Sequence, residues 1–275
     1  MTETGHLPVL GHADPGGATF RVAKFTGALF NAPMKVATWN VNGIRARASQ
    51  LDEWLLQARP DVLCLQELKA TPEQIPPILA DHPDYWCTWH GAGAYSGVAI
   101  LVSRARYPER PPTAHPPFDT ETRALTVTLP EATIASIYVP NGGKDYPAKL
   151  AFFDAMTAWA AAAPRPLILC GDLNIARADI DVHPKERKPT AIGQLPEERA
   201  RFETLLATGL IDVARTLAPT DDALFTWWAP WRNLRQRNIG WRIDYILASA
   251  DLTATACSSL REVGSSDHGP ILATF

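Results

Sequence analysis

Short apolar runs, each about as long as a buried strand, recur along this 275-residue chain and constrain its fold more than any other feature. Such runs, bounded by glycine, proline or polar residues, predict strands packed inside a sheet. In chain order they are Val36–Val41, Val62–Gln66, Val98–Val102, Ala124–Leu129, Thr133–Val139, Leu167–Cys170, Ile243–Ala248 and Ile271–Phe275.

Three stretches between these runs predict helices, namely Gln50–Ala58, Ala148–Ala163 and Glu197–Thr208. Ser49 is of a type that caps helix N-termini, and Pro60 ends the first helix. Strands outnumber helices and several follow one another directly, so a simple alternation of strand and helix is excluded. The sequence therefore predicts an α/β fold with two packed sheets and helices on the outside.

Residues 1–33 contain glycine, proline and histidine without sustained periodicity, unlike the rest of the chain. They show no charged segment followed by an apolar core, so a secretory signal is not predicted. We expect a flexible extension over residues 1–33, or a start site upstream of the true one at Met34, followed by a catalytic domain over residues 34–275.

Charge and cysteine content restrict the setting in which the protein acts. No run of about 18 apolar residues exists, so no membrane span is predicted. The four cysteines show no CxxC pairing, and Cys64 and Cys170 lie in strand-like runs, which favours a reducing, cytoplasmic setting.

The net charge of −3 gives no hint of a nucleic-acid partner. The segment Trp231–Arg242, however, has four arginines and no acid, so it is either a solvated loop or a DNA-facing surface.

Polar residues adjoin the predicted strands at six places, and each place offers a carboxylate, amide, imidazole or phenol. Singly, an aspartate or asparagine after a strand is usually a turn former. If these strand ends converge, several carboxylates share one pocket and require a cation to offset their repulsion. Their oxygens, with neighbouring amides, suit Mg²⁺ or Mn²⁺ better than zinc. The residues are Asn40, Glu67, Tyr138, Asn141, Asp172, Asn174, Asp244, Asp267 and His268.

The ordered motifs WNVNGIR, LCLQELK, YSGVAIL, YVPNG, GDLNIA, GWRIDYILAS and SSDHGPI resemble the exonuclease III/apurinic-apyrimidinic (AP) endonuclease family. The resemblance covers essentially all of Met34–Phe275, and it extends to the wider endonuclease/exonuclease/phosphatase superfamily. It implies a four-layer α/β sandwich, in which two mixed β-sheets are flanked by helices. It also implies a monomeric Mg²⁺-dependent hydrolase of DNA repair, in which Mn²⁺ can replace Mg²⁺.

The same resemblance assigns the substrate and the metal ligands. The implied substrate is double-stranded DNA with abasic sites or blocked 3′ ends, cut at the phosphodiester 5′ to the abasic site, with 3′→5′ exonuclease and 3′-end-cleaning activity. Glu67 resembles the principal metal ligand of the family, assisted by Asp267 and Asn40. In some accounts Asp172 and Asn174 hold a second metal ion.

The catalytic roles implied by the resemblance fall on five residues. Asp172 matches the residue that activates or orients the attacking water, and Asn174 matches its partner at the scissile phosphate. His268 resembles the imidazole that contacts the phosphate, with Asp244 fixing its orientation by a hydrogen bond. Tyr138 matches the active-site phenol.

Substrate-binding positions also follow from the resemblance. Large apolar side chains are expected to line a pocket for the base-less sugar, with Gly193 leaving its entrance open. Two further side chains are expected to enter the grooves of the DNA, and two to contact phosphates. The pocket residues are Trp227, Trp241 and Ile243, the groove residues Trp231 and Lys144, and the phosphate contacts Tyr95 and Asn141. Arg232, Arg235 and Arg237 are expected to add phosphate contacts.

Alternatives remain open at this point. The tryptophans of the pocket could be ordinary core residues. The enzyme could be a 3′-exonuclease or 3′-phosphatase without strong abasic-site incision, or a phosphodiesterase of the same fold acting on a substrate other than DNA. A catalytically inactive DNA-binding module would be expected to lack one of the core polar residues, and all are present. Asn42 departs from some family members, which have aspartate there.

Overall fold

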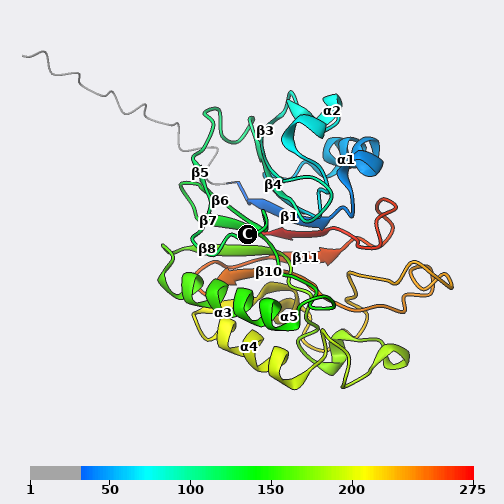
Figure 1. The fold of residues 1–275 in the computed structure, drawn as a ribbon. Coiled ribbons are helices and arrows are strands. Elements are labelled where there is room, and N and C mark those ends of the chain that lie inside the picture. Colours follow the sequence, from blue (N-terminus) through cyan, green and yellow to red (C-terminus); the bar gives the residue numbers. More distant parts are fainter. Residues whose placement is uncertain (1–31) are drawn as a thin grey trace, which may run out of the picture. The chain divides into compact units, whose positions relative to one another are not determined.

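Within residues 32–275, the eight predicted strands and four that were not predicted form two mixed sheets of six strands each (Figure 1). The computed structural model describes residues 32–275, so the extension expected over residues 1–33 lies almost wholly outside the described residues. The first sheet has the order β11 (Ala256–Ser259), β12 (Ile271–Thr274), β1 (Lys35–Asn40), β2 (Val62–Gln66), β4 (Val98–Ser103) and β3 (Tyr85–His90). The second has the order β5 (Thr113–Ala114), β6 (Ala124–Thr128), β7 (Thr133–Tyr138), β8 (Leu167–Asp172), β10 (Asp244–Ser249) and β9 (Leu210–Asp212).

One parallel pair lies at the centre of each sheet, β1 with β2 in the first and β7 with β8 in the second. The two sheets pack face to face, and buried hydrogen bonds join them. The Ser136 hydroxyl of β7 donates to the Leu65 carbonyl of β2 over 3.0 Å, and the Gln66 amide donates to the Ser136 hydroxyl over 3.1 Å. The parallel pairs therefore lie against each other with little freedom to slide.

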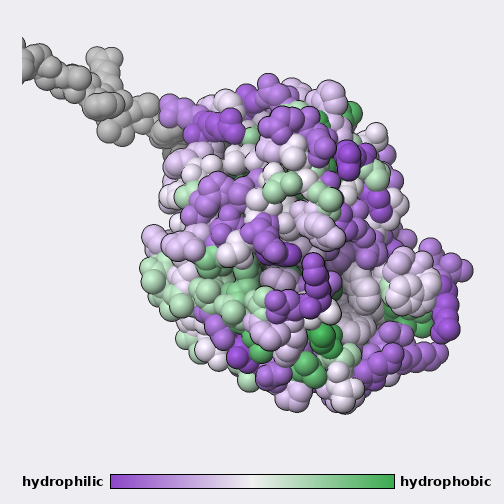
Figure 2. All heavy atoms as spheres, viewed as in Figure 1, coloured by the Kyte–Doolittle hydropathy of each residue, from purple (hydrophilic) through white to green (hydrophobic). Residues whose placement is uncertain are grey.

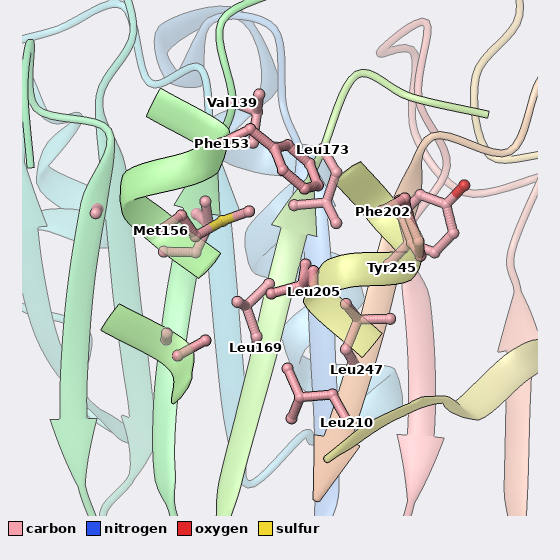
Figure 3. Close-up of a cluster of buried hydrophobic side chains, with 14 of the residues drawn as sticks. Val139, Phe153, Met156, Leu169, Leu173, Phe202, Leu205, Leu210, Tyr245 and Leu247 are labelled. Carbon is pink, nitrogen blue, oxygen red and sulfur yellow. The ribbon is translucent and has the colours of Figure 1, made fainter. Parts of the chain in front are cut away.

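Helices cover the outer face of each sheet, which completes the four layers expected from the sequence (Figure 1). Leu51 and Trp54 of α1 pack on the first sheet. Figure 3 shows Phe153 of α3 and Phe202 of α4 among the apolar side chains of the second sheet. The helices are α1 (Ile44–Ala58), α2 (Pro77–Ala80), α3 (Tyr146–Ala162), α4 (Pro196–Leu206) and α5 (Val213–Leu217), with short 3₁₀ turns at Pro72–Gln74, Asp179–Asp181 and Pro184–Glu186.

The first helix begins six residues before its predicted start at Gln50, so Ser49 lies inside α1 and is not its N-cap. The N-cap is Gly43, whose φ of 100° is unfavourable for residues with a side chain. The amides of Gly43 and Ile44 donate to the carbonyls of Glu67 and Leu68 over 2.8 and 3.0 Å. Tertiary hydrogen bonds, rather than a capping side chain, therefore start this helix and attach it to the segment after β2.

The surface of the described residues is mainly polar. Large apolar side chains are exposed at few of the described positions, and Figure 2 shows a pale-green hydrophobic area on the left of this face among mainly hydrophilic residues. Within residues 32–275, no helix combines the length and the apolar character needed to cross a membrane. All four cysteines are free.

Candidate active site

Functional side chains meet where the central strands end. Asn40 ends β1, Tyr138 and Asp172 end the parallel pair β7 and β8, and Glu67 follows β2. Asp244 begins β10, and the antiparallel register of β10 with β8 sets it opposite Asp172. The two parallel strands at the centre of each sheet have their carboxyl ends side by side. Because the sheets pack face to face, the side chains at the ends of β1 and β2 meet those at the ends of β7 and β8.

Glu67 is held by three donors. Its Oε1 accepts from the Asn40 amide over 3.0 Å and from the Tyr138 hydroxyl over 2.8 Å. The Lys69 ammonium lies 2.7 Å from Oε2. Burial alone would raise the pKa of Glu67, but the hydrogen bonds from Asn40 and Lys69 outweigh it and lower the pKa overall. The carboxylate is therefore ionised and fixed in direction.

Asp172 is the least compensated carboxylate of the cluster. Its oxygens accept from the Asn40 amide over 2.9 Å and from the Asn174 backbone N–H over 2.9 Å. The nearest cationic group is the His268 imidazole, 3.9 Å away. Burial, and then the charge of Asp244, raise the pKa of Asp172 to about 8. A nearby cation would favour its charged form.

His268 is buried and oriented by Asp244, whose Oδ2 lies 2.8 Å from Nδ1. The Thr226 hydroxyl donates to the same Oδ2 over 2.7 Å, and the Trp39 indole donates to the His268 carbonyl over 3.1 Å. Burial lowers the pKa of His268, but Asp244 outweighs burial and raises the pKa to about 10. The imidazole is therefore cationic at neutral pH, with Nε2 directed toward Asp172.

Asp267 completes the group of carboxylates. It accepts from the Asn42 amide over 2.7 Å and from the Trp227 indole over 3.0 Å. Burial raises the pKa of Asp267, but His268, Asn42 and Trp227 together lower it. The Lys69 ammonium donates to the side-chain amide oxygen of Asn42 over 2.5 Å, so the Asn42 side chain connects Asp267 to the Glu67 side of the cluster.

These groups face one cavity of about 410 Å³. The apolar part of its wall comes from Trp227, Trp241 and Ile243, with the two indoles edge to face and 5.5 Å between ring centroids. The polar part of its wall comes from Asn42, Glu67, Lys69, Tyr138, Asn141, Asp172, Asn174, Asp267 and His268. The cavity thus joins a charged cluster to an apolar surface.

Known proteins resemble this chain in sequence and in fold. The model of the Endonuclease/Exonuclease/phosphatase family matches residues 37–268. The chain belongs to this family. Within it, the DNA repair nuclease APEX1 of Danio rerio is 35% identical over 258 residues, covering 87% of this chain and 81% of that protein. The exodeoxyribonuclease of Bacillus subtilis is 31% identical, covering 86% and 98%. The solved structure of an AP endonuclease from Archaeoglobus fulgidus has a TM-score of 0.80 at 27% identity, covering 88% and 99%.

The predicted resemblance to exonuclease III and AP endonucleases is therefore confirmed, and the chain is a hydrolase of that type. The donor set fits the metal dependence of this nuclease family. Glu67 and Asp172 each offer a carboxylate oxygen, and these oxygens and a ring nitrogen of His268 lie within 4.8 Å of one another. The raised pKa of Asp172 marks a buried carboxylate whose charge a cation would compensate.

Three residues predicted to bind substrate lie outside the cavity wall. Tyr95 is 80% exposed and Trp231 is 59% exposed. Lys144 is also exposed. Side chains this open are free to meet a large ligand such as DNA, whereas Asn141 and the pocket residues line the cavity itself.

The expectation of a DNA-facing arginine stretch is wrong for two of its four members. Arg242 is buried and donates to Asp181 and Asp212 over 2.7 to 2.8 Å. Arg235 donates to the backbone carbonyls of Arg261, Ser266 and Val263, so its guanidinium supports a loop. The sequence shows that an arginine is charged, but it does not show whether its guanidinium binds groups inside the protein or faces solvent. Arg232 and Arg237 are exposed, as a phosphate contact requires.

Sequence reasoning missed four residues that shape the site. Lys69 lies in the motif LCLQELK, two residues after Glu67, and this position could have indicated its role in the site. Thr226 positions Asp244, and Ile192 lines the cavity. The buried Lys149 ammonium donates to the Asn174 carbonyl over 2.8 Å and pairs with Glu198. No motif marks the last three, because their roles depend on contacts between distant segments.

Proposed function

We propose that this chain is a Mg²⁺-dependent AP endonuclease that hydrolyses the phosphodiester 5′ to abasic sites in duplex DNA, with 3′→5′ exonuclease and 3′-end-cleaning activity. One observation carries the proposal, the apolar wall of Trp227, Trp241 and Ile243 in the same cavity as Asp172 and His268. A base-less sugar would enter this pocket, whereas an intact nucleotide would be excluded by its size.

Gly193 supports the shape of this pocket. Its φ is 91°, and a Cβ atom there would lie 3.1 Å from the Trp241 ring and 3.2 Å from the Asn174 carbonyl oxygen. The backbone therefore passes directly beneath the tryptophan, where a side chain would push the ring into the cavity. Glycine at this position keeps space for the sugar.

The side chains of the cavity offer the separate functions that phosphodiester hydrolysis requires, which are metal binding, contact with the phosphate and activation of water. Glu67 would be the principal ligand of Mg²⁺, with the carboxylate of Asp267 facing the same cavity. The bound ion would neutralise phosphate oxygens and stabilise charge on the leaving 3′ oxygen. The cationic His268 would donate a hydrogen bond to a phosphate oxygen. The Asp172 carboxylate would orient the attacking water and accept its proton.

The proposed function is tested with an end-labelled duplex that carries one tetrahydrofuran abasic-site analogue. We expect a single cut on the 5′ side of the analogue in Mg²⁺ and no cut in EDTA. The same duplex with an intact nucleotide serves as the control and is expected to remain uncut internally. Digestion from the 3′ end alone would reject abasic-site incision and favour the exonuclease alternative, and cleavage in EDTA would reject the metal dependence.

Trp231 offers a separate test of DNA binding. Trp231→Ala is expected to weaken binding to the abasic duplex on the order of tenfold, because one aromatic contact with the DNA is lost. The single-turnover rate at saturating enzyme is expected to stay unchanged, since Trp231 lies outside the cavity. Fluorescence anisotropy measures the binding. Leu56→Ala, which also removes an exposed apolar side chain, is the control. Unchanged affinity of Trp231→Ala would dismiss the contact.

A further inference from the structure

Two histidines and one aspartate form a cluster that shares no residue with the active site. His90 is the last residue of β3, His115 follows β5, and Asp119 lies in the connection from β5 to β6. The Asp119 Oδ2 lies 2.6 Å from Nε2 of His90 and 3.6 Å from Nδ1 of His115. The two imidazole rings are 4.1 Å apart between centroids. Three potential ligand atoms thus converge at one point.

The local backbone fixes the direction of the Asp119 carboxylate. Its Oδ1 accepts from the backbone N–H groups of Arg123 and Ala124, each over 2.8 Å. Oδ2 is therefore left facing the two imidazoles. Burial raises the pKa of Asp119, but the hydrogen bond from His90 and the two backbone donors lower it overall. The carboxylate is ionised and oriented before any ligand arrives.

We propose that His90, His115 and Asp119 bind one divalent transition-metal ion of the Zn²⁺ class, with the remaining coordination position open to water. Two imidazole nitrogens and one carboxylate oxygen match the protein ligands of four-coordinate zinc sites that keep the fourth position for water. With metal–ligand distances of about 2.0–2.2 Å, tetrahedral ligand atoms lie roughly 3.3 Å apart. The two separations from Asp119, 2.6 and 3.6 Å, lie on either side of this value, and all three ligand atoms lie within 4.8 Å of one another, so side-chain adjustment is needed but no rearrangement of the backbone.

The nitrogen ligands separate this cluster chemically from the active site. Imidazole favours Zn²⁺, Co²⁺ or Ni²⁺, whereas carboxylate and amide oxygens suit Mg²⁺. His115 is more than half exposed, which leaves a path for the ion and for a water ligand.

The place of the cluster in the fold indicates what a bound ion would do. β3 and β5 are end strands of the two different sheets (Figure 1). An ion held by His90 and His115 would therefore cross-link the sheets at this edge. The connection that carries Asp119 continues to Arg123, whose guanidinium lies 4.8 Å from the ring centre of Tyr138. The cross-link would thus brace a segment that contacts the active-site phenol.

Metal counting on the full-length chain tests the site. The protein is equilibrated with ZnCl₂ in excess Mg²⁺, which keeps oxygen sites filled, and bound zinc is measured after gel filtration. We expect wild type to retain one more zinc per chain than His115→Gln or His90→Gln. His183→Gln is the matched control and is expected to equal wild type. Zinc is also expected to raise the unfolding temperature of wild type more than that of His115→Gln.

Each outcome decides the proposal. Equal zinc content in wild type and both cluster variants would overturn it and leave a histidine–aspartate hydrogen-bond network. A loss of one zinc in His183→Gln as well would also overturn it, because the effect would not be specific to the cluster. His115 is largely exposed, so the variant that depends on it is expected to fold normally.

Discussion

Asp172→Asn is expected to lower the single-turnover rate of abasic-site cleavage by about a thousandfold, equivalent to about 4 kcal/mol of transition-state stabilisation. The amide has nearly the same volume and can still accept from the Asn174 N–H, which now lies 2.9 Å away. It cannot accept a proton from water, and it carries no charge to hold a cation. Rates are measured on the tetrahydrofuran duplex at saturating enzyme and Mg²⁺.

Asp251→Asn is the matched control, because it makes the same chemical change at an exposed turn. Its rate is expected to equal that of wild type. Thermal unfolding of Asp172→Asn is expected to remain cooperative, which would separate a chemical defect from a folding defect. A rate within tenfold of wild type would contradict the assignment of Asp172 as the residue that acts on water.

The strand pattern predicted most of the fold because the central strands are buried on both faces. β2 and β8 are buried throughout, and such strands appear in the sequence as continuous apolar runs. The missed strands have weaker patterns. β3 has the sequence YWCTWH and lies at a sheet edge, so polar residues interrupt it. β11 alternates between exposed and half-buried residues, and β5 has only two residues.

The location of the site was predictable because its polar residues adjoin buried strands. Asn40, Tyr138, Asp172 and Asp244 all stand at strand ends that strand pairing and sheet packing then bring together. The second layer of contacts was not predictable. Thr226, for example, reaches Asp244 because the chain turns back after it and pairs Trp227 with Trp241 in an antiparallel bridge. Such a contact leaves no periodic or compositional signal.

Arg242 shows the limit of charge as a sequence signal. It resembles its arginine neighbours in the sequence, yet it is almost fully buried between two aspartates. Its backbone N–H donates to the Asp181 carbonyl over 2.8 Å, two residues before Asp244. The ion pairs therefore anchor the entry to β10, and through Asp244 they help to place His268. Arg242 stabilises the site from inside the protein rather than meeting DNA.

Arg242→Met is expected to lower the free energy of unfolding by about 3–5 kcal/mol, the cost of leaving buried carboxylates without their cation. Arg242 makes a bidentate pair with Asp212 at 2.7 and 2.8 Å and also contacts Asp181. Arg215 lies 2.6 Å from Asp181, whereas the remaining partner of Asp212, Arg177, lies 3.6 Å away, so the larger loss falls on Asp212. Urea denaturation at neutral pH measures the difference.

The pH dependence and a matched control sharpen this test. Burial raises the pKa of Asp181, but Arg242 and Arg215 outweigh it and lower the pKa, so the pair stabilises above about pH 4 and is lost in acid. In Arg242→Met, protonation of Asp181 in acid removes the cost of burying its charge. The difference in unfolding free energy between variant and wild type should therefore shrink as pH falls.

The matched control is Arg201→Met, which breaks an exposed ion pair with Asp154 and should lower the free energy of unfolding by less than about 1 kcal/mol. If the two variants lose equal stability at neutral pH, Arg242 is not the anchor of β10, and the placement of Asp244 and His268 must come from the sheet alone.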